Sequence, residues 1–165
     1  MTATDELIRN NETYAADFDK SKLPMPPATH VAVVACMDAR LDPARALGLE
    51  EGDAHVIRNA GGLATDDALR SLVISRTLLG TQEAFVIGHT DCGMETFTND
   101  QIHAKLHDEL GADASAVDFE PFPHVHESVA ASVRRLRDSD LVPDDYPIRG
   151  FVYDVKTGRI DEVDA

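Results

Sequence analysis

The chain lacks tryptophan, has only two cysteines, and contains no apolar run that approaches the roughly 20 residues needed to cross a membrane. Two cysteines are too few for a disulfide scaffold, so we expect thiols or metal ligands in a reducing compartment. Basic residues are also scarce, because 15 lysines and arginines stand against 30 aspartates and glutamates, a formal charge of −15. Such a surface repels phosphate backbones and anionic lipids, which argues against nucleic-acid and membrane partners. The first residues lack the basic start and apolar run of a signal peptide, so we expect a cytoplasmic protein.

What the sequence does contain is enough for one domain with a real core. The 165 residues, 43% of them hydrophobic, predict a single domain over residues 1–165. A proline-rich stretch over residues 21–30 separates an N-terminal arm, residues 1–30, from a body, residues 31–165. Aspartate outnumbers glutamate 20 to 10, and arginine outnumbers lysine 11 to 4. This composition favours a halophilic protein, with an ordinary acidic protein as the alternative.

The hydrophobic pattern alternates between strands and helices. Two apolar runs, residues 31–35 and 84–88, predict strands that are covered on both faces of a parallel sheet. Further strands are expected over residues 54–57, 148–155 and 160–163, and helices over residues 4–18 with Thr4 as N-cap, 65–79, 95–110 and 124–137. The fold class is therefore α/β: a central, mainly parallel sheet flanked by helices, with an antiparallel C-terminal edge hairpin and an N-terminal helical arm.

Metal-binding side chains follow two of the predicted strands. Cys36 comes directly after the first run, and His89 and Cys92 follow the later one. Ligand sites gather at the carboxyl ends of parallel strands, so neighbouring strands would bring two thiolates and one imidazole together. Three protein ligands and an open fourth position are typical of catalytic zinc, although two buried cysteines also occur simply as small hydrophobic residues. Gly88 and Gly93 flank the second pair and are expected to relieve the backbone there.

A carboxylate and a guanidinium lie close to the first proposed ligand. Asp38 and Arg40 follow Cys36 by two and four residues, and such a pair is able to form charge-assisted hydrogen bonds. Held by Arg40, Asp38 would stay ionised and accept a hydrogen bond from the fourth ligand of the zinc. Unpaired, it would itself close the coordination sphere in an inactive state. The alternative is an exposed loop salt bridge of about 0–1 kcal/mol.

Three segments together resemble the signatures of the β-class carbonic anhydrases, in the same order. They are Ala35-Cys-Met-Asp-Ala-Arg40, Arg58-Asn-Ala-Gly-Gly62 and Gly88-His-Thr-Asp-Cys-Gly93. The resemblance implies zinc ligation by Cys36, His89 and Cys92, a catalytic Asp38–Arg40 dyad, and a homodimer or dimer of dimers. It also implies reversible hydration of carbon dioxide to bicarbonate. The length matches the short prokaryotic branch, and the absence of tryptophan argues against the inhibitory bicarbonate pocket of one regulated branch.

Other functions stay open on the sequence alone. A carbon disulfide or carbonyl sulfide hydrolase would use the same zinc site on another linear molecule. A non-catalytic zinc-binding scaffold or sensor would keep Asp38 locked on the metal. A thiol enzyme with Cys36 as nucleophile would need a nearby base, and His89 is better used as a ligand.

Overall fold

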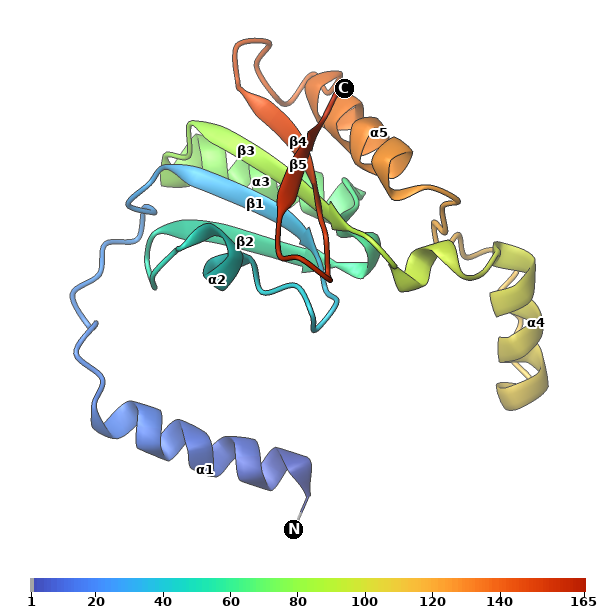
Figure 1. Ribbon diagram of the computed structural model, residues 1–165, viewed down its shortest axis with the longest axis horizontal. Helices are drawn as coiled ribbons and strands as arrows, with labels where there is room; N and C mark the ends of the chain where they lie inside the picture. The colour runs from blue at the N-terminus through green and yellow to red at the C-terminus, as the bar shows by residue number, and fades with distance from the viewer. Residues whose placement is uncertain (1) are drawn as a thin grey trace.

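A computed structural model describes residues 2–165, and its centre is one five-stranded sheet with the strand order β2-β1-β3-β4-β5 (Figure 1). The strands are β1 (Val31–Cys36), β2 (Ala54–Asn59), β3 (Glu83–His89), β4 (Ile148–Tyr153) and β5 (Ile160–Val163). All neighbouring pairs are parallel except β4 and β5, which are antiparallel. The predicted fold class and the C-terminal edge hairpin are thus confirmed.

The helices cover the sheet or extend from it. They are α1 (Ala3–Ala16), α2 (Pro43–Leu47), α3 (Asp66–Leu79), α4 (Asn99–Leu110) and α5 (Val125–Arg137), with short 3₁₀ turns η1 (Ala60–Gly62) and η2 (Gly93–Glu95). Strand β1 is buried on both faces, as its unbroken apolar run predicted. Ala32 and Val34 face the core formed with α3 and α5, whereas Val33 and Ala35 face a second cluster that includes Leu41.

Helix α5 packs directly on the middle of the sheet through one apolar side. Its Val125, Val129, Val133 and Leu136 side chains recur at helical spacing and are all buried. Gly88 makes this close packing possible, because a Cβ atom there would lie 2.7 Å from Val125 and 2.8 Å from Val129. The expectation that Gly88 and Gly93 relieve the backbone was wrong, since neither has a positive φ.

Several element boundaries differ from the predicted ones. Helix α1 is capped by Thr2, whose side chain accepts from the Asp5 amide, and not by Thr4. Helix α4 begins only after Thr98, which caps it in the same way, while residues 93–95 form a separate 3₁₀ turn. Near each helix start two threonines lie two residues apart, Thr2 and Thr4 or Thr96 and Thr98, so the sequence alone does not decide which threonine is the N-cap.

One short helix was not predicted, and one apolar side chain is not in the core. The five residues of α2 are too few to show a periodic pattern, although Asp42 caps them and Pro43 occupies the first turn. Leu78, an apolar residue near the end of α3, is 74% exposed.

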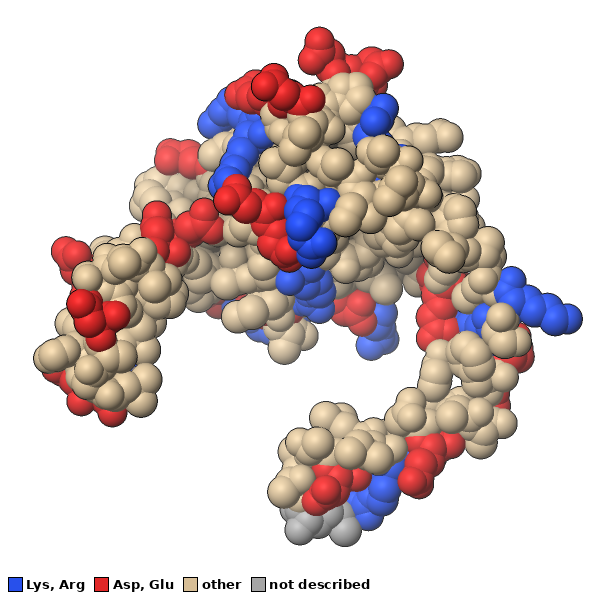
Figure 2. All heavy atoms as spheres, turned by 180° about the vertical axis from the view of Figure 1, so that it is seen from behind, with Lys and Arg blue, Asp and Glu red and all other residues tan. Residues whose placement is uncertain are grey.

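The N-terminal arm stands away from the body. Helix α1 has no buried residue, and its Leu7 and Ile8 side chains are 67% and 59% exposed. It is tied to the body by Glu51, which accepts a 2.6 Å hydrogen bond from the Tyr14 hydroxyl and pairs with Lys20 at 2.9 Å. Figure 2 shows from behind that this arm and α4 extend from opposite sides of the body. Within residues 2–165, no helix is long and apolar enough to span a membrane.

Candidate metal centre

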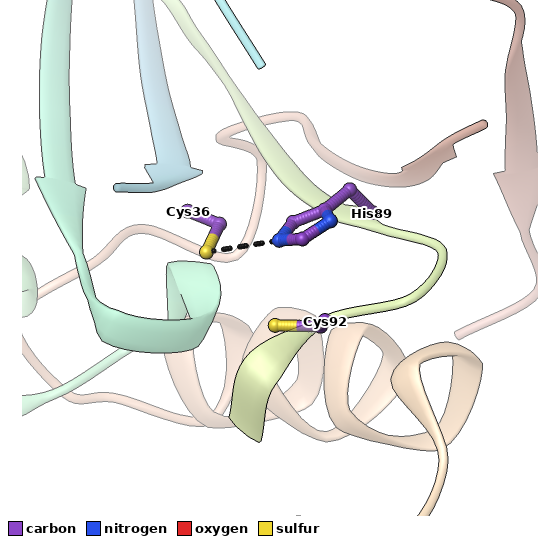
Figure 3. A group of neighbouring side chains, drawn as sticks. All are labelled: Cys36, His89 and Cys92. Atoms are coloured by element: carbon purple, nitrogen blue, oxygen red, sulfur yellow. Dashed lines mark hydrogen bonds between the residues drawn. The ribbon is translucent and has the colours of Figure 1, made fainter. Parts of the chain in front are cut away.

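The carboxyl ends of β1 and β3 bring three metal-binding side chains together (Figure 3). Cys36 ends β1, His89 ends the adjacent parallel strand β3, and Cys92 follows in the next turn. Their ligand atoms all lie within 4.8 Å of one another, and Cys36 Sγ is 3.2 Å from His89 Nε2. All three side chains are buried. Among the described residues, no other group of three or more Cys, His, Asp or Glu side chains is arranged to hold a metal ion.

The donor set fits a zinc ion. Zinc–sulfur bonds of about 2.3 Å and zinc–nitrogen bonds of about 2.0–2.1 Å place neighbouring tetrahedral donors about 3.5–3.8 Å apart, close to the spacing of this cluster. His89 Nδ1 lies 2.9 Å from the Thr90 carbonyl, to which Nδ1–H donates, so that Nε2 presents its lone pair to the cluster. This hydrogen bond fixes both the tautomer and the orientation of the ring.

The two thiols shift each other's pKa in opposite directions. A hydrogen bond from Cys92 is the main cause that lowers the pKa of Cys36. The same contact, together with burial, raises the pKa of Cys92. Two thiolates so close together repel each other, whereas a divalent cation between them stabilises both deprotonated forms.

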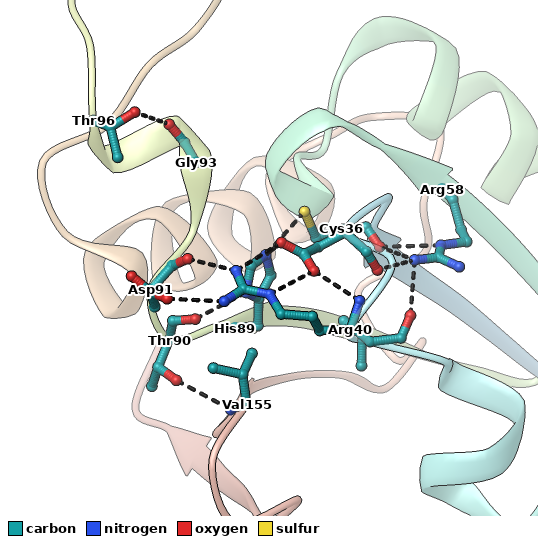
Figure 4. Close-up of polar contacts among 11 residues, drawn as sticks. Cys36, Arg40, Arg58, His89, Thr90, Asp91, Gly93, Thr96 and Val155 are labelled. Atoms are coloured by element: carbon teal, nitrogen blue, oxygen red, sulfur yellow. Dashed lines mark hydrogen bonds and ion pairs between the residues drawn. The ribbon is translucent and has the colours of Figure 1, made fainter.

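Asp38 and Arg40 form a two-pronged ion pair beside the cluster. Figure 4 shows the Arg40 guanidinium between Cys36 and Asp91. Arg40 Nε donates to Asp38 Oδ1 at 3.0 Å, and Nη2 donates to Oδ2 at 2.9 Å. The Arg40 backbone amide adds a third bond to Oδ1 at 2.8 Å. These hydrogen bonds from Arg40 hold the pKa of Asp38 well below its usual range, so the carboxylate is ionised. Its Oδ2 lies 3.6 Å from His89 Nε2, within reach of an ion bound to the cluster.

Arg58 of β2 holds the loop that carries Cys36 and Asp38 through hydrogen bonds to its main chain. Arg58 Nε and Nη2 both donate to the Cys36 carbonyl, at 3.0 and 2.7 Å. The same Nη2 also lies 2.8 Å from the carbonyls of Asp38 and Leu41 (Figure 4). One guanidinium therefore donates to three backbone carbonyls at the end of β1 and in the loop after it, where the Asp38 carbonyl also accepts from the Leu41 amide at 3.1 Å. Arg58 begins the second of the three signature segments, but only the structure shows that its side chain binds main chain.

Gly62 gives this region its close packing. Its φ is +66°, and a Cβ atom there would lie 2.7 Å from the Cys36 amide nitrogen and 2.8 Å from the Ile87 carbonyl oxygen. Both constraints require glycine. The turn η1 is thereby able to lie directly against the ends of β1 and β3.

Asp91 is a site residue that sequence reasoning missed. Arg40 Nη1 donates to its Oδ2 at 2.8 Å, and Arg40 Nη2 donates to its carbonyl oxygen, also at 2.8 Å. Asp91 adopts a left-handed conformation with φ +57°, which aspartate tolerates better than most residues with a side chain. The sequence signal was present in the His-Thr-Asp-Cys turn, but the partner is 51 residues away.

The turn that carries Asp91 is anchored on the C-terminal hairpin. The Thr90 amide donates to the Tyr153 carbonyl at 2.9 Å, and the Val155 amide donates to the Thr90 hydroxyl at 3.2 Å. The antiparallel edge of the sheet thus supports the second ligand loop.

Comparison with known proteins gives this geometry a family. A sequence model described as carbonic anhydrase matches residues 31–160. The chain belongs to the carbonic anhydrase family. It is 51% identical over 163 residues to the β-carbonic anhydrase 1 of Mycobacterium tuberculosis strain H37Rv, with 99% of both chains covered. The crystal structure of a carbonic anhydrase from Streptococcus mutans matches with a TM-score of 0.95 at 49% identity, again covering 99% of each chain.

A second activity also occurs among the relatives. A protein from Acidithiobacillus thiooxidans named carbon disulfide hydrolase is 35% identical over 180 residues, covering 97% of this chain and 90% of that protein. The resemblance to β-class carbonic anhydrases seen in the three sequence segments is nevertheless confirmed along the full chain. Carbonic anhydrases of this class are zinc enzymes, and Cys36, His89 and Cys92 form the cluster that can hold the zinc ion.

Proposed function

We propose that this carbonic anhydrase catalyses the reversible hydration of carbon dioxide to bicarbonate and a proton. One observation carries the proposal: Asp38 is held in a two-pronged pair by Arg40 while its Oδ2 lies 3.6 Å from His89 Nε2. A purely structural zinc site does not need an ionised carboxylate that is kept beside the metal but bound to another group. The arrangement suits a site with one position open to reactants.

Cys36, His89 and Cys92 would hold the zinc. When bound, the ion lowers the pKa of a coordinated water and so supplies a nucleophile near neutral pH. Asp38 would accept the hydrogen bond of that nucleophile and turn its lone pair toward carbon dioxide. Arg40 keeps Asp38 ionised and so able to accept this hydrogen bond. We therefore assign Asp38 the catalytic role and Arg40 the role of holding it.

Asp38 would also have an inactive position. Because its carboxylate is so close to His89 Nε2, release from Arg40 would allow it to become the fourth metal ligand. That closed state excludes reactants. The hydrogen bonds from Arg40 favour the open state.

Asp38→Asn tests this proposal. The amide keeps the size of the side chain but loses the charge that Arg40 holds, so we expect the zinc content to stay near one ion per chain while turnover falls. A loss of about 10²-fold is the scale of removing one acid–base or orienting group. Stopped-flow hydration of carbon dioxide and metal analysis, on both proteins, give the result. A wild-type protein that binds zinc without hydrating carbon dioxide would refute the function.

A hydrolase for carbon disulfide or carbonyl sulfide is the second candidate. It is supported by the relative of that name, which covers nearly the whole chain at 35% identity. The 51% identical relative is named a carbonic anhydrase and favours carbon dioxide. A paired assay of hydration and hydrogen sulfide release by one preparation separates the two, since each product is measured independently.

We further propose that the chain works as a homodimer or a dimer of dimers. A 14-residue helix such as α1 is marginal in water by itself, yet none of its residues is buried and its Leu7 and Ile8 side chains face solvent. Strand β2 is an edge of the sheet with only β1 as a partner. A second copy would cover both surfaces. We therefore treat residues 1–30 as an arm that reaches a partner, and residues 31–165 as the catalytic body of one domain.

Sedimentation of the full chain tests the assembly. Leu7→Asp places a charge on the exposed apolar side of α1, and Glu12→Gln changes the charge of the same helix without adding one to that apolar side. We expect the first variant alone to shift the protein toward monomers. A monomeric wild type would refute the proposal. A cytoplasmic location is the further proposal, because a zinc site with two thiolates suits a reducing compartment.

A further inference from the structure

Arg40 is shared between the two loops that carry the metal-binding side chains. It lies on the first loop, where it pairs with Asp38. It also pairs with Asp91 of the second loop, which lies between His89 and Cys92 in the sequence. The contacts to Asp91 involve both its carboxylate and its carbonyl, each at 2.8 Å. Arg40 therefore links the end of β1 to the turn after β3 (Figure 4).

The geometry of the guanidinium makes these contacts dependent on one another. Its donors lie in one rigid plane, with Nε and Nη2 toward Asp38 and Nη1 and Nη2 toward Asp91. Rotation that frees Asp38 would also break the bonds to Asp91. The second loop thus resists the movement that the closed state of Asp38 requires.

The backbone of Asp91 is fixed in the orientation that this contact needs. Its φ of +57° is a left-handed conformation that most side chains disfavour. The preceding Thr90 is held on both sides by Tyr153 and Val155 of the C-terminal hairpin. The turn therefore presents the Asp91 carboxylate and carbonyl together to Arg40.

We propose that Asp91 is a positioning residue that clamps Arg40 onto Asp38 and so keeps the fourth metal position open. The inference rests on the proposed function, because it extends the Asp38–Arg40 pair by a third member from the other ligand loop. Asp91 touches neither the metal ligand atoms nor Asp38 in any described hydrogen bond, so its effect runs through Arg40.

Two substitutions separate the clamp from the backbone conformation. Asp91→Gly removes the side-chain acceptor and accepts the left-handed φ, whereas Asp91→Asn keeps an acceptor oxygen and also tolerates that φ. Asp67→Asn is the matched control, since Asp67 also pairs with an arginine, at 2.7 Å, and its side chain is 75% exposed against 72% for Asp91. If Asp91→Gly does not retain metal, Asp91→Ser replaces it.

The experiment measures azide binding to the cobalt-substituted proteins, and the visible spectrum of the bound cobalt reports how much azide is bound. Azide binds at the fourth metal position, so occupation of that position by Asp38 lowers the azide affinity. We expect Asp91→Gly to weaken azide binding by up to about fivefold, the scale of one partly exposed ion pair, and Asp91→Asn by less than about twofold. The kcat for hydration should fall by the same factors with little change in KM, and Asp67→Asn should match the wild type.

The Asp38→Asn background makes the test specific. There the carboxylate that closes the site is gone, so adding Asp91→Gly should no longer change azide affinity. An effect that persists in this background would overturn the proposal, as would wild-type azide affinity in Asp91→Gly alone. Azide binding does not depend on the reaction catalysed. A wild type without hydration activity would refute the proposed function and still leave this inference decided by the spectra.

Discussion

Replacing Gly62 by alanine tests how closely the backbone must pack beneath the metal-binding residues. The added Cβ would lie 2.7 Å from the Cys36 amide nitrogen and 2.8 Å from the Ile87 carbonyl oxygen, inside any ordinary contact distance. A non-glycine residue at positive φ costs about 1–2 kcal/mol. Overpacking against two backbone atoms of β1 and β3 adds about 1–3 kcal/mol. We therefore expect Gly62→Ala to lower the free energy of unfolding by about 2–5 kcal/mol.

Gly48→Ala is the control for the conformational part. Gly48 has φ +68°, almost that of Gly62, but a Cβ atom there would meet nothing within 4 Å. It should cost only the backbone term of about 1–2 kcal/mol. Denaturant unfolding of metal-free protein at one fixed protein concentration measures both variants. Equal losses in the two would refute the close-approach argument. In the zinc-loaded protein, Gly62→Ala alone should release zinc faster to a chelator, because the methyl group displaces Cys36.

The remaining predictions concern the main chain, the core and the surface. Arg58→Met would remove the Arg58 donor from the Cys36, Asp38 and Leu41 carbonyls, of which Asp38 keeps the Leu41 amide, and should lower stability by about 1–3 kcal/mol. Denaturant unfolding measures this change, and an unchanged midpoint would contradict the role of Arg58 in holding this loop. Ser75→Ala should lower the free energy of unfolding by about 1–3 kcal/mol, because the buried Ser75 hydroxyl bonds to His55 at 2.7 Å and to Thr81 at 3.0 Å. Thr77→Ala, on the exposed side of the same helix, is the control and should change little in the same denaturant unfolding experiment. For a halophilic protein of formal charge −15, the free energy of unfolding should rise from low to molar KCl as the Debye length shrinks from about 10 Å to about 3 Å; a flat or falling dependence would exclude halophily.

The sheet and the meeting of the three metal-binding residues were predictable because they depend on short-range patterns. Unbroken apolar runs indicate buried parallel strands, and the carboxyl ends of adjacent parallel strands lie at one edge. Cys36 and His89 each come at the end of such a run, so their proximity followed once the strands were taken as neighbours. The order of strands did not follow from these patterns, since they carry no information on which strand pairs with which.

The supporting residues were less predictable because their partners are distant in the chain. Arg58 binds carbonyls 17 to 22 residues away, and backbone carbonyls leave no mark in a sequence. Positive φ at the second ligand turn was expected of the flanking glycines but lies on Asp91. Gly88 instead marks the contact with α5, a role that depends on how a helix 37 residues later packs on β3.

The exposed apolar residues of α1 bear on how this chain assembles. The sequence predicted a helix in an N-terminal arm that the proline-rich stretch separates from the body. In the structure the Tyr14 and Lys20 contacts with Glu51 fix the direction of the arm, while its apolar residues remain exposed. An exposed apolar helix gains stability by burial, and the body of the same chain does not bury this one, which supports the proposed assembly with a second copy. If the sedimentation test confirms that assembly, the metal centre is best studied in the oligomer and not in the single chain.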